Sequence, residues 1–340
     1  MEYDSHMVRV LVQIPCLNEE SSISEVISSV PRSIDGVDRV DVLVIDDSSS
    51  DRTIELALAS GADYIIEKKR HRGLANSFSL GASFFLARDY DVLVNTDGDN
   101  QYDQVQIPNL IRPIVDRQAE LCLADRQVKT LPHFSRPKKW LQKLGSKIVS
   151  VASTVFVPDA ATGFRAYSRD LVANLNVTTS FSYAMETLIQ AGNAGFRVAS
   201  ICSPGKNVDR PSRLFRNSRE HVLKSAQAIL RAFVLYRPLF TFLTISAVLF
   251  ALGTIPFARY LIVSLTGNNA EYLQSLILGT VLLLGSFSSA TLAILADSIR
   301  ANRMLVERQL ATYRLNCGKE YHHAMMLNFD AEVIYSRENE

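Results

Sequence analysis

The sequence predicts an α/β domain with a mostly parallel sheet, followed by a transmembrane hairpin of two helices. Two observations carry this prediction. In the N-terminal part of the 340-residue chain, short β-branched and apolar runs alternate with segments of helical periodicity, which is typical of an open parallel sheet. Near the C-terminus, two long uncharged segments reach the roughly 20 residues that a helix needs to cross a bilayer.

The strand and helix pattern can be followed along the first part of the chain. The predicted strands cover residues 8–14, 40–45, 64–66 and 92–94, and the predicted helices cover 23–30, 53–60 and 74–87. Ser22 and Glu25 have the spacing of a capping box at the start of the first helix. Asp51 is a predicted cap of the second helix, and Gly61 supplies its stop.

Two acidic clusters follow predicted strands. Asp46 and Asp47 end the second strand, and Asp97 and Asp99 follow the fourth. Because ligands of parallel sheets bind outside the carboxyl ends of the strands, both clusters are expected at one crevice. Two carboxylates that flank Gly98 form a compact oxygen site for a hard divalent cation, with positions left for diphosphate oxygens. This pattern predicts a nucleoside diphosphate substrate.

Several other functions lose support. No GxGxxG motif follows the first strand, and no P-loop, HExxH or GxSxG motif occurs, which argues against dinucleotide binding, P-loop chemistry and two hydrolase types. The balance of 36 Lys+Arg against 35 Asp+Glu argues against a nucleic-acid partner. The four cysteines lack CxxC spacing, which predicts reduced thiols. The six histidines show no partner spacing and are predicted to be ordinary surface or loop residues.

The predicted spans lie at residues 239–258 and 272–296. Between Leu239 and Ala296 the charged residues are Arg259 and Glu271 alone. Basic residues lie outside both spans, and the link between them has no Lys or Arg. By the positive-inside rule, the N-terminal domain and both termini are expected to be cytoplasmic, and the protein is expected in the cell inner (plasma) membrane. No secretory signal is expected at the N-terminus.

This pattern divides the chain into predicted segments. They are an N-terminal extension or tag scar at 1–7, the α/β domain at 8–214, a juxtamembrane amphipathic helix at 215–238, the two transmembrane helices at 239–297 and a cytoplasmic tail at 298–340. The sequence does not decide whether the tail docks or is disordered. Small residues in the spans predict a homo-oligomer.

Six short motifs resemble the signatures of a known family. The first group is IPCLNEE at 14–20, DDSSSD at 46–51 and DGDNQ at 97–101. It resembles family 2 glycosyltransferases, whose catalytic domain has the GT-A fold, a Rossmann-like and mostly parallel α/β sheet. The second group is ADR at 124–126, TGFRAY at 162–167 and RPSRL at 210–214. It is similar to the branch of dolichyl-phosphate mannose synthases and bacterial polyprenyl-phosphate glucosyltransferases.

The resemblance implies roles for particular residues. The nucleotide-sugar site comprises Pro15, Leu17, Asn18, Glu19, Asp46 or Asp47 at the base, Arg72, Gly73 and Asp97. The metal site, for Mg²⁺ or Mn²⁺, comprises Asp97, Asp99 and Gln101. The catalytic group comprises Asp97, Asp99, Arg126, Arg165 and Glu186, the last as a pocket-orienting carboxylate. The acceptor-phosphate site comprises Arg126, Lys139, Lys143, Ser146, Arg210 and Arg213.

The implied reaction moves a hexose from a nucleotide-diphosphate sugar to the phosphate of a polyprenyl-phosphate lipid, with inversion at the anomeric carbon. The bacterial relatives favour UDP-glucose as the donor, and a GDP-mannose-dependent mannose synthase is the alternative. A processive polysaccharide synthase is less favoured, because the chain has two predicted spans and its one tryptophan, Trp140, is not in a QxxRW motif. A non-catalytic membrane scaffold is the remaining alternative.

Overall fold

The computed structural model describes residues 8–127, 146, 149–151, 153–177, 183–204, 206, 234–265 and 273–337. These residues form two compact units. The first contains the described residues up to Lys206 together with those from Glu307 onward, and the second contains the described residues between 234 and 306. The two units are described separately below.

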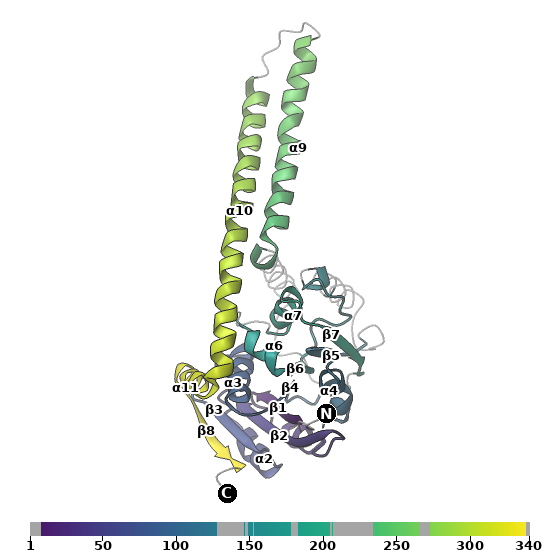
Figure 1. The fold of residues 1–340 in the computed structure, drawn as a ribbon, viewed down its shortest axis with the longest axis vertical. Helices are drawn as coiled ribbons and strands as arrows, with labels where there is room; N and C mark the ends of the chain where they lie inside the picture. The colour runs from purple at the N-terminus through teal and green to yellow at the C-terminus, as the bar shows by residue number, and fades with distance from the viewer. Residues whose placement is uncertain are drawn as a thin grey trace, which may run out of the picture. The chain divides into compact units, whose positions relative to one another are not determined.

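The first unit is built on one mixed sheet (Figure 1). Its strands are β1 (Val8–Cys16), β2 (Val37–Asp46), β3 (Tyr64–Lys68), β4 (Val92–Asn95), β5 (Leu121–Asp125), β6 (Arg165–Ser168), β7 (Val198–Cys202) and β8 (Ala331–Ser336). Their order in space is β7-β5-β6-β4-β1-β2-β3-β8. The pairs β4-β1, β1-β2 and β2-β3 are parallel, whereas β6 and β8 run antiparallel to their neighbours. The predicted mostly parallel sheet is confirmed.

Helices connect the strands and bury the sheet. They are α1 (Ile23–Ser28), α2 (Thr53–Ala59), α3 (Leu74–Ala87), α4 (Ile107–Val115), α6 (Arg169–Asn174) and α7 (Tyr183–Asn193), with a 3₁₀ turn, η1 (Gln104–Gln106), before α4. The middle of β1 is fully buried, as expected for a continuous apolar run in a parallel sheet. The rigid centre of the sheet fixes the loops that leave its carboxyl edge.

The two predicted helix starts have different outcomes. The capping box of Ser22 and Glu25 is wrong, because the Ser22 side chain makes no cap bond. Its Oγ donates instead to the Gly98 carbonyl at 2.7 Å, which ties the start of α1 to the loop after β4. The cap predicted at Asp51 is displaced by one residue, because the N-cap of α2 is Arg52 and makes no side-chain cap bond. Asp51 Oδ1 nevertheless accepts from the Thr53 backbone N at 3.0 Å, beside the start of the helix.

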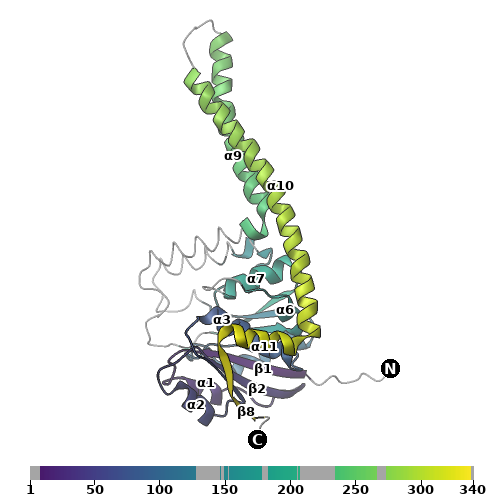
Figure 2. The same ribbon diagram turned by 90° about the vertical axis from the view of Figure 1, so that its left-hand side faces the viewer.

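The C-terminal region decides between the two alternatives that the sequence leaves open for the tail. Its described residues from Glu307 to Arg337 belong to the first unit, so this part of the chain docks. The helix α11 (Gly318–Phe329) packs on α3, and β8 pairs antiparallel with β3 (Figure 2). An unpaired strand edge exposes backbone N–H and C=O groups, and β8 supplies partners for those of β3.

His322, on α11, is a correction, because it is not an ordinary surface residue. Its Nδ1 lies 2.9 Å from Ser83 Oγ on α3, and its ring contacts Phe84 edge-on. Burial lowers the pKa of His322 to about 4, so the ring is neutral at physiological pH.

The second unit contains a helical hairpin. Its helices are α9 (Pro238–Leu265) and the part of α10 (Leu273–Asn316) that ends at Val306. Their most apolar windows have mean hydropathies of 2.0 and 1.9 and are 11% and 22% buried, so most of their apolar side chains face outward. Ser246 and Ser286 hydrogen-bond each other's backbone carbonyls at 2.9 Å across the hairpin. The described residues thus include two helices long and apolar enough to cross a membrane, where the sequence predicts them. The predicted amphipathic helix falls mostly on residues 215–233, outside the described residues.

Candidate active site

The candidate site lies at the carboxyl edge of the sheet, where β1, β2 and β4 end (Figure 1). The loops after β1 and β2 are bound together by short hydrogen bonds. The backbone N of Asn18 donates to Ser49 Oγ at 2.9 Å, and Asn18 Oδ1 accepts from the Ser50 backbone N at 2.8 Å. The backbone N of Glu19 donates to Thr53 Oγ1 at 2.8 Å. These bonds build one rigid wall from two of the predicted nucleotide motifs.

Asp46 and Asp47 hold these loops from inside. Asp46 is fully buried, and its Oδ2 accepts from the Ser49 backbone N at 2.8 Å. Asp47 is 4% exposed and accepts from the backbone N of Arg72 at 2.9 Å and of Gly73 at 2.8 Å. It also pairs with Lys68 Nζ at 2.5 Å. Both carboxylates are engaged with the protein itself, and the contact of one of them with a nucleotide base stays a prediction.

The remaining predicted donor residues surround this wall. Gly73 has φ of 87° and starts α3, a left-handed conformation that favours glycine. The Arg72 side chain is exposed beside it. Pro15 is buried at the end of β1, and Leu17 follows half-buried. The structure thus brings the predicted nucleotide-sugar residues other than Asp97 to the ends of β1, β2 and β3, and Asp97 follows β4.

The second acidic cluster has a different environment. Asp97 Oδ1 has no exposed surface and no hydrogen-bond partner among the described residues. Burial, reinforced by the neighbouring Asp99 carboxylate, raises the pKa of Asp97 to about 7. Asp99 Oδ1 accepts from the Gln101 backbone N at 3.2 Å. A buried carboxylate oxygen without a partner is costly, and a cation would satisfy it.

Gly163 fixes the wall against which Asp97 lies. A Cβ at Gly163 would stand 2.6 Å from Asp97 Oδ2, so only glycine fits without a shift of the carboxylate. The Gly163 backbone N donates to the Tyr102 hydroxyl at 2.7 Å, and its carbonyl accepts from Asn95 Nδ2 at 2.9 Å. Asn95 is in turn held by Gln13 Nε2 at 2.8 Å. Both backbone groups of Gly163 are therefore fixed by buried side chains.

Arg126 places a positive side-chain charge near Asp97. Its Nε and NH2 donate to the two oxygens of Asp159 at 2.7 and 3.1 Å. Asp159 is 1% exposed at its side chain, whereas Arg126 keeps 16%, so the arginine is the member that a ligand can reach. Ser146 Oγ accepts from the Ala160 backbone N at 3.3 Å and is buried, so it supports the loop that holds Asp159.

Arg165, a member of the predicted catalytic group, is enclosed by the protein itself. It is fully buried, and its guanidinium donates to the carbonyls of Thr162, Ala160 and Ala184. These bonds connect the loop around Gly163 to the start of α7. The structure therefore gives Arg165 a positioning role in place of the predicted catalytic one.

The other predicted residues are placed as follows. Glu186 lies in the first turn of α7, which Arg165 anchors, and is 8% exposed. The predicted acceptor residues Lys139, Lys143, Arg210 and Arg213 lie outside the described residues. Within the described ranges, no group of three or more His, Cys, Asp and Glu side chains could hold a metal ion alone. A cation at Asp97 and Asp99 would therefore need further ligand atoms.

Known proteins with similar sequences indicate the family to which this site belongs. A family profile described as glycosyl transferase family 2 matches residues 11–175, which include both acidic clusters and the Gly163 loop. The chain carries a family 2 glycosyltransferase domain. The match confirms the family predicted from the first three motifs, and the protein is a glycosyltransferase.

Three relatives of the glycosyltransferase are named for transfer to, or synthesis on, a polyprenyl-type lipid phosphate. An undecaprenyl-phosphate mannosyltransferase of Micrococcus luteus is 26% identical over 57% of this chain and 82% of its own length. A dolichyl-phosphate hexose transferase of Haloferax volcanii is 29% identical over 55% and 78%. A polyprenol monophosphomannose synthase of Mycolicibacterium smegmatis is 26% identical over 57% and 76%.

Solved structures confirm the fold of the glycosyltransferase. The glucosyl-3-phosphoglycerate synthase of Mycobacterium tuberculosis in complex with uridine diphosphate aligns with a TM-score of 0.52 and 21% identity, over 66% of this chain and 79% of that one. A second crystal structure of the same enzyme aligns with a TM-score of 0.51 and 20% identity, over 65% of this chain and 80% of that one. The predicted GT-A fold is therefore confirmed.

Some residues of the glycosyltransferase site were missed in the sequence. Asp159 orients Arg126, Tyr102 holds Gly163, and Lys68 pairs with Asp47. Lys206 lies beside the metal motif, since its backbone N donates to the Gln101 carbonyl at 2.9 Å and its Nζ to Asn100 Oδ1 at 3.3 Å. A lysine at the end of a buried strand was a usable signal for Lys68, but the other contacts join distant parts of the chain.

Proposed function

We propose that this glycosyltransferase transfers a hexose from a nucleoside-diphosphate sugar to the phosphate of a polyprenyl-phosphate lipid in the membrane. The observation that carries the proposal is the unpartnered, buried Oδ1 of Asp97, which lies in a two-carboxylate motif near the Arg126 and Asp159 pair. This arrangement provides a cation site and a fixed positive charge in one place. The names of the three relatives, which all concern polyprenyl-type lipid phosphates, support this class of acceptor.

The donor sugar is proposed as a hexose, with mannose tested first. The sequence favoured UDP-glucose, but two of the three relatives are named for mannose and one for hexose in general. The loops bound by Asp46 and Asp47 form the proposed nucleotide wall, and Arg72 is exposed beside it as the proposed diphosphate contact.

Asp97, Asp99 and Gln101 are the residues that would hold Mg²⁺ or Mn²⁺. The fit rests on the buried Asp97 oxygen and on the hard oxygen ligands that such cations prefer. When bound, the cation offsets the negative charge that grows on the departing nucleoside diphosphate. A structure of the Mycobacterium tuberculosis enzyme contains Mn²⁺ and uridine diphosphate, which supports a cation in this fold.

The acceptor needs no catalytic base. A phosphate monoester is already ionised near neutral pH, because its second pKa is about 6. The chain must instead hold this anion near a donor that is also negative. Arg126, oriented by both oxygens of Asp159, supplies a rigid charge for that purpose. Displacement by the phosphate oxygen on the face opposite the leaving group inverts the anomeric carbon.

The membrane position fits this acceptor. We place α9 and α10 across the inner membrane, with the catalytic domain and both termini cytoplasmic, on the basis of the basic flanks. A homo-oligomer through the small residues of the hairpin remains part of the proposal.

The test is transfer of radiolabel from GDP-mannose, UDP-glucose and other nucleotide hexoses to undecaprenyl phosphate in detergent. Label in the organic phase that requires Mg²⁺ or Mn²⁺ and disappears with EDTA is the expected result. Asp99→Asn removes it, whereas Asp116→Asn, a surface carboxylate with 44% side-chain exposure, leaves it intact. Folded protein that binds nucleotide yet labels no lipid from any donor would overturn the proposed acceptor.

A further inference from the structure

The chain supplies the last strand of its catalytic sheet after it has passed through both apolar helices. This C-terminal segment, residues 318–337, consists of α11, β8 and Arg337. The helix α11 packs on α3, and β8 pairs with β3 along its whole length, from Tyr64 opposite Ser336 to Lys68 opposite Ala331. Figure 2 shows α11 and β8 together on one side of the sheet. Both elements that they contact, α3 and β3, border the proposed donor pocket.

One end of β8 is fastened to the loop that follows β3. The Lys69 backbone N donates to the Asp330 carbonyl at 3.0 Å, just before β8 begins. Glu332 lies 3.6 Å from Lys69 Nζ. The C-terminal segment therefore fixes the chain within a few residues of Arg72 and Gly73.

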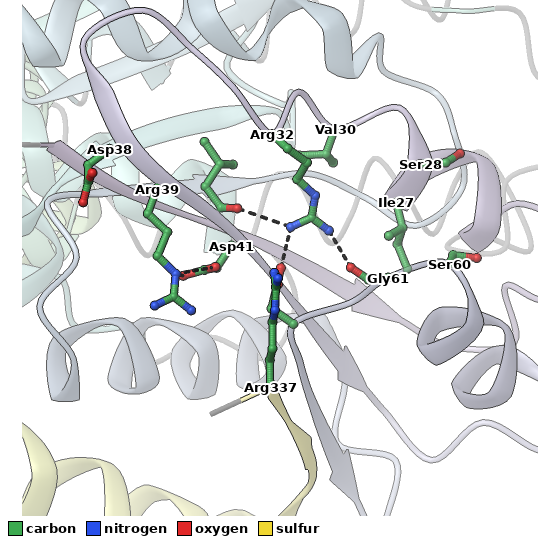
Figure 3. A pocket seen from close by; sticks show the side chains of 12 residues that line it. Ile27, Ser28, Val30, Arg32, Asp38, Arg39, Asp41, Ser60, Gly61 and Arg337 are labelled. Carbon is green, nitrogen blue, oxygen red and sulfur yellow. Dashed lines mark hydrogen bonds and ion pairs between the residues drawn. The ribbon is translucent and has the colours of Figure 1, made fainter. Parts of the chain in front are cut away.

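The other end of β8 is anchored at the start of β3, opposite to the end that carries the candidate site. Arg337 NH1 donates to Asp63 Oδ1 at 3.1 Å, and its backbone N donates to the Asp63 carbonyl at 2.9 Å. Arg32 pairs with the second oxygen of Asp63, which also accepts from the Val42 backbone N at 2.8 Å. Figure 3 shows Arg32 and Arg337 directed toward each other in a pocket that both side chains line. Asp63 has a side-chain exposure of 3%, so the anchor is built on a buried carboxylate with two cations.

Lys68 connects β8 to the donor loop. It is the last residue of β3, it pairs with Ala331 of β8, and it is fully buried. Its Nζ contacts Asp47 Oδ1 at 2.5 Å and donates to Ser77 Oγ of α3 at 2.7 Å. Asp47 in turn accepts from the backbone N of Arg72 and of Gly73. An uninterrupted set of contacts thus runs from the C-terminal segment to the start of α3.

We propose that the C-terminal segment is a positioning element for the donor pocket, in which β8 fixes Lys68 and Lys68 fixes Asp47 and the backbone at Arg72 and Gly73. The inference rests on the proposed function, because it takes this pocket as the nucleotide-sugar site. It makes donor affinity depend on residues that follow α10 in the chain. Lys68 and β8 act through Asp47 and are positioning residues, with no contact to the reacting atoms required.

The test compares two different lesions in the full membrane protein in detergent. A chain that ends at Asp330 lacks β8, and Lys68→Met keeps β8 but loses the ammonium between Asp47 and Ser77. The matched controls are a chain that ends at Arg337 and Lys319→Met, since Lys319 is exposed on α11. Binding of UDP and GDP in the presence of Mn²⁺ is measured by calorimetry, and hydrogen exchange is followed in the peptide that spans residues 69–77.

Both lesions are expected to weaken binding of the nucleoside diphosphate at least tenfold and to speed exchange in residues 69–77, while the controls change neither. In turnover, the donor KM rises and the KM for polyprenyl phosphate stays the same. Unchanged affinity and unchanged exchange in Lys68→Met would overturn the inference even if the shortened chain fails to fold.

Failure of the proposed function gives a different result. If the unaltered protein binds neither UDP nor GDP and labels no lipid, the proposed function is wrong. The exchange measurement still decides the inference in that case, because faster exchange of residues 69–77 in Lys68→Met supports the coupling without any ligand, and unchanged exchange overturns it.

Discussion

The two acidic clusters of the site use the same residue type in opposite ways. Asp47 accepts from two backbone N–H groups and pairs with a buried lysine, so its charge stabilises the folded chain. Asp97 has a buried Oδ1 to which no described residue donates a hydrogen bond, so this oxygen is left for a ligand. In this site, the carboxylate that accepts hydrogen bonds from backbone N–H groups of another loop has a structural role, and the carboxylate whose oxygen lacks such a donor is available to a ligand.

The largest effect on activity is expected from a substitution of Asp97. Asp97→Asn is expected to lower hexose transfer on the order of 10³-fold, because the cation site loses a charged ligand and transition-state charge is no longer offset. The melting temperature without metal is expected to stay equal or rise, since a negative charge disfavoured by burial and by Asp99 is replaced by a neutral amide. Transfer assays and thermal melts of the same preparations check both. A large loss of stability would show that Asp97 is structural after all.

The opposite pattern is expected at Asp47. Asp47→Asn removes the partner of the buried Lys68 and weakens two backbone bonds, so the free energy of unfolding should fall by about 3 kcal/mol. The donor KM rises as the start of α3 loosens, while kcat at saturating donor changes little. Denaturant unfolding with steady-state kinetics tests this. Asp116→Asn, at the protein surface, serves as the matched control.

Much of this contrast could be predicted from the sequence, and some could not. The strands, the parallel sheet and both acidic clusters follow from local patterns of apolar and polar residues. The division of labour between Asp47 and Asp97 does not, because it depends on contacts with residues 72, 73 and 163, which lie elsewhere in the chain. β8 was missed for the same reason. Its Val333 and Ile334 are half-exposed and short of a full apolar pattern, and pairing with β3 makes the strand.

A substitution at Gly163 tests whether the position of the Asp97 carboxylate matters for activity. In Gly163→Ala, the new Cβ would lie 2.6 Å from Asp97 Oδ2, and neither protein group that holds Gly163 can easily move away. The carboxylate must turn, and transfer is expected to fall by about 10-fold to 100-fold, since small misplacements in an active site are costly. Gly285→Ala is the control, because its nearest atom is 3.6 Å away. A tenfold higher Mn²⁺ requirement in Gly163→Ala would place the defect at the cation site.

The smallest effect is expected on the outer face of α3, which supports the Asp47 side. The folded-state pKa of His322 is about 4, below the ordinary value of about 6.5. The unfolded chain therefore binds a proton more readily, so the stabilising effect is complete above pH 6.5 and is lost as the pH falls toward 4. The loss should amount to about 1–2 kcal/mol after allowance for partial exposure. Denaturant unfolding between pH 4 and pH 7 measures it, and His322→Gln should flatten this part of the profile. An equal slope in both proteins would mean that the packing of α11 on α3 does not depend on a neutral ring.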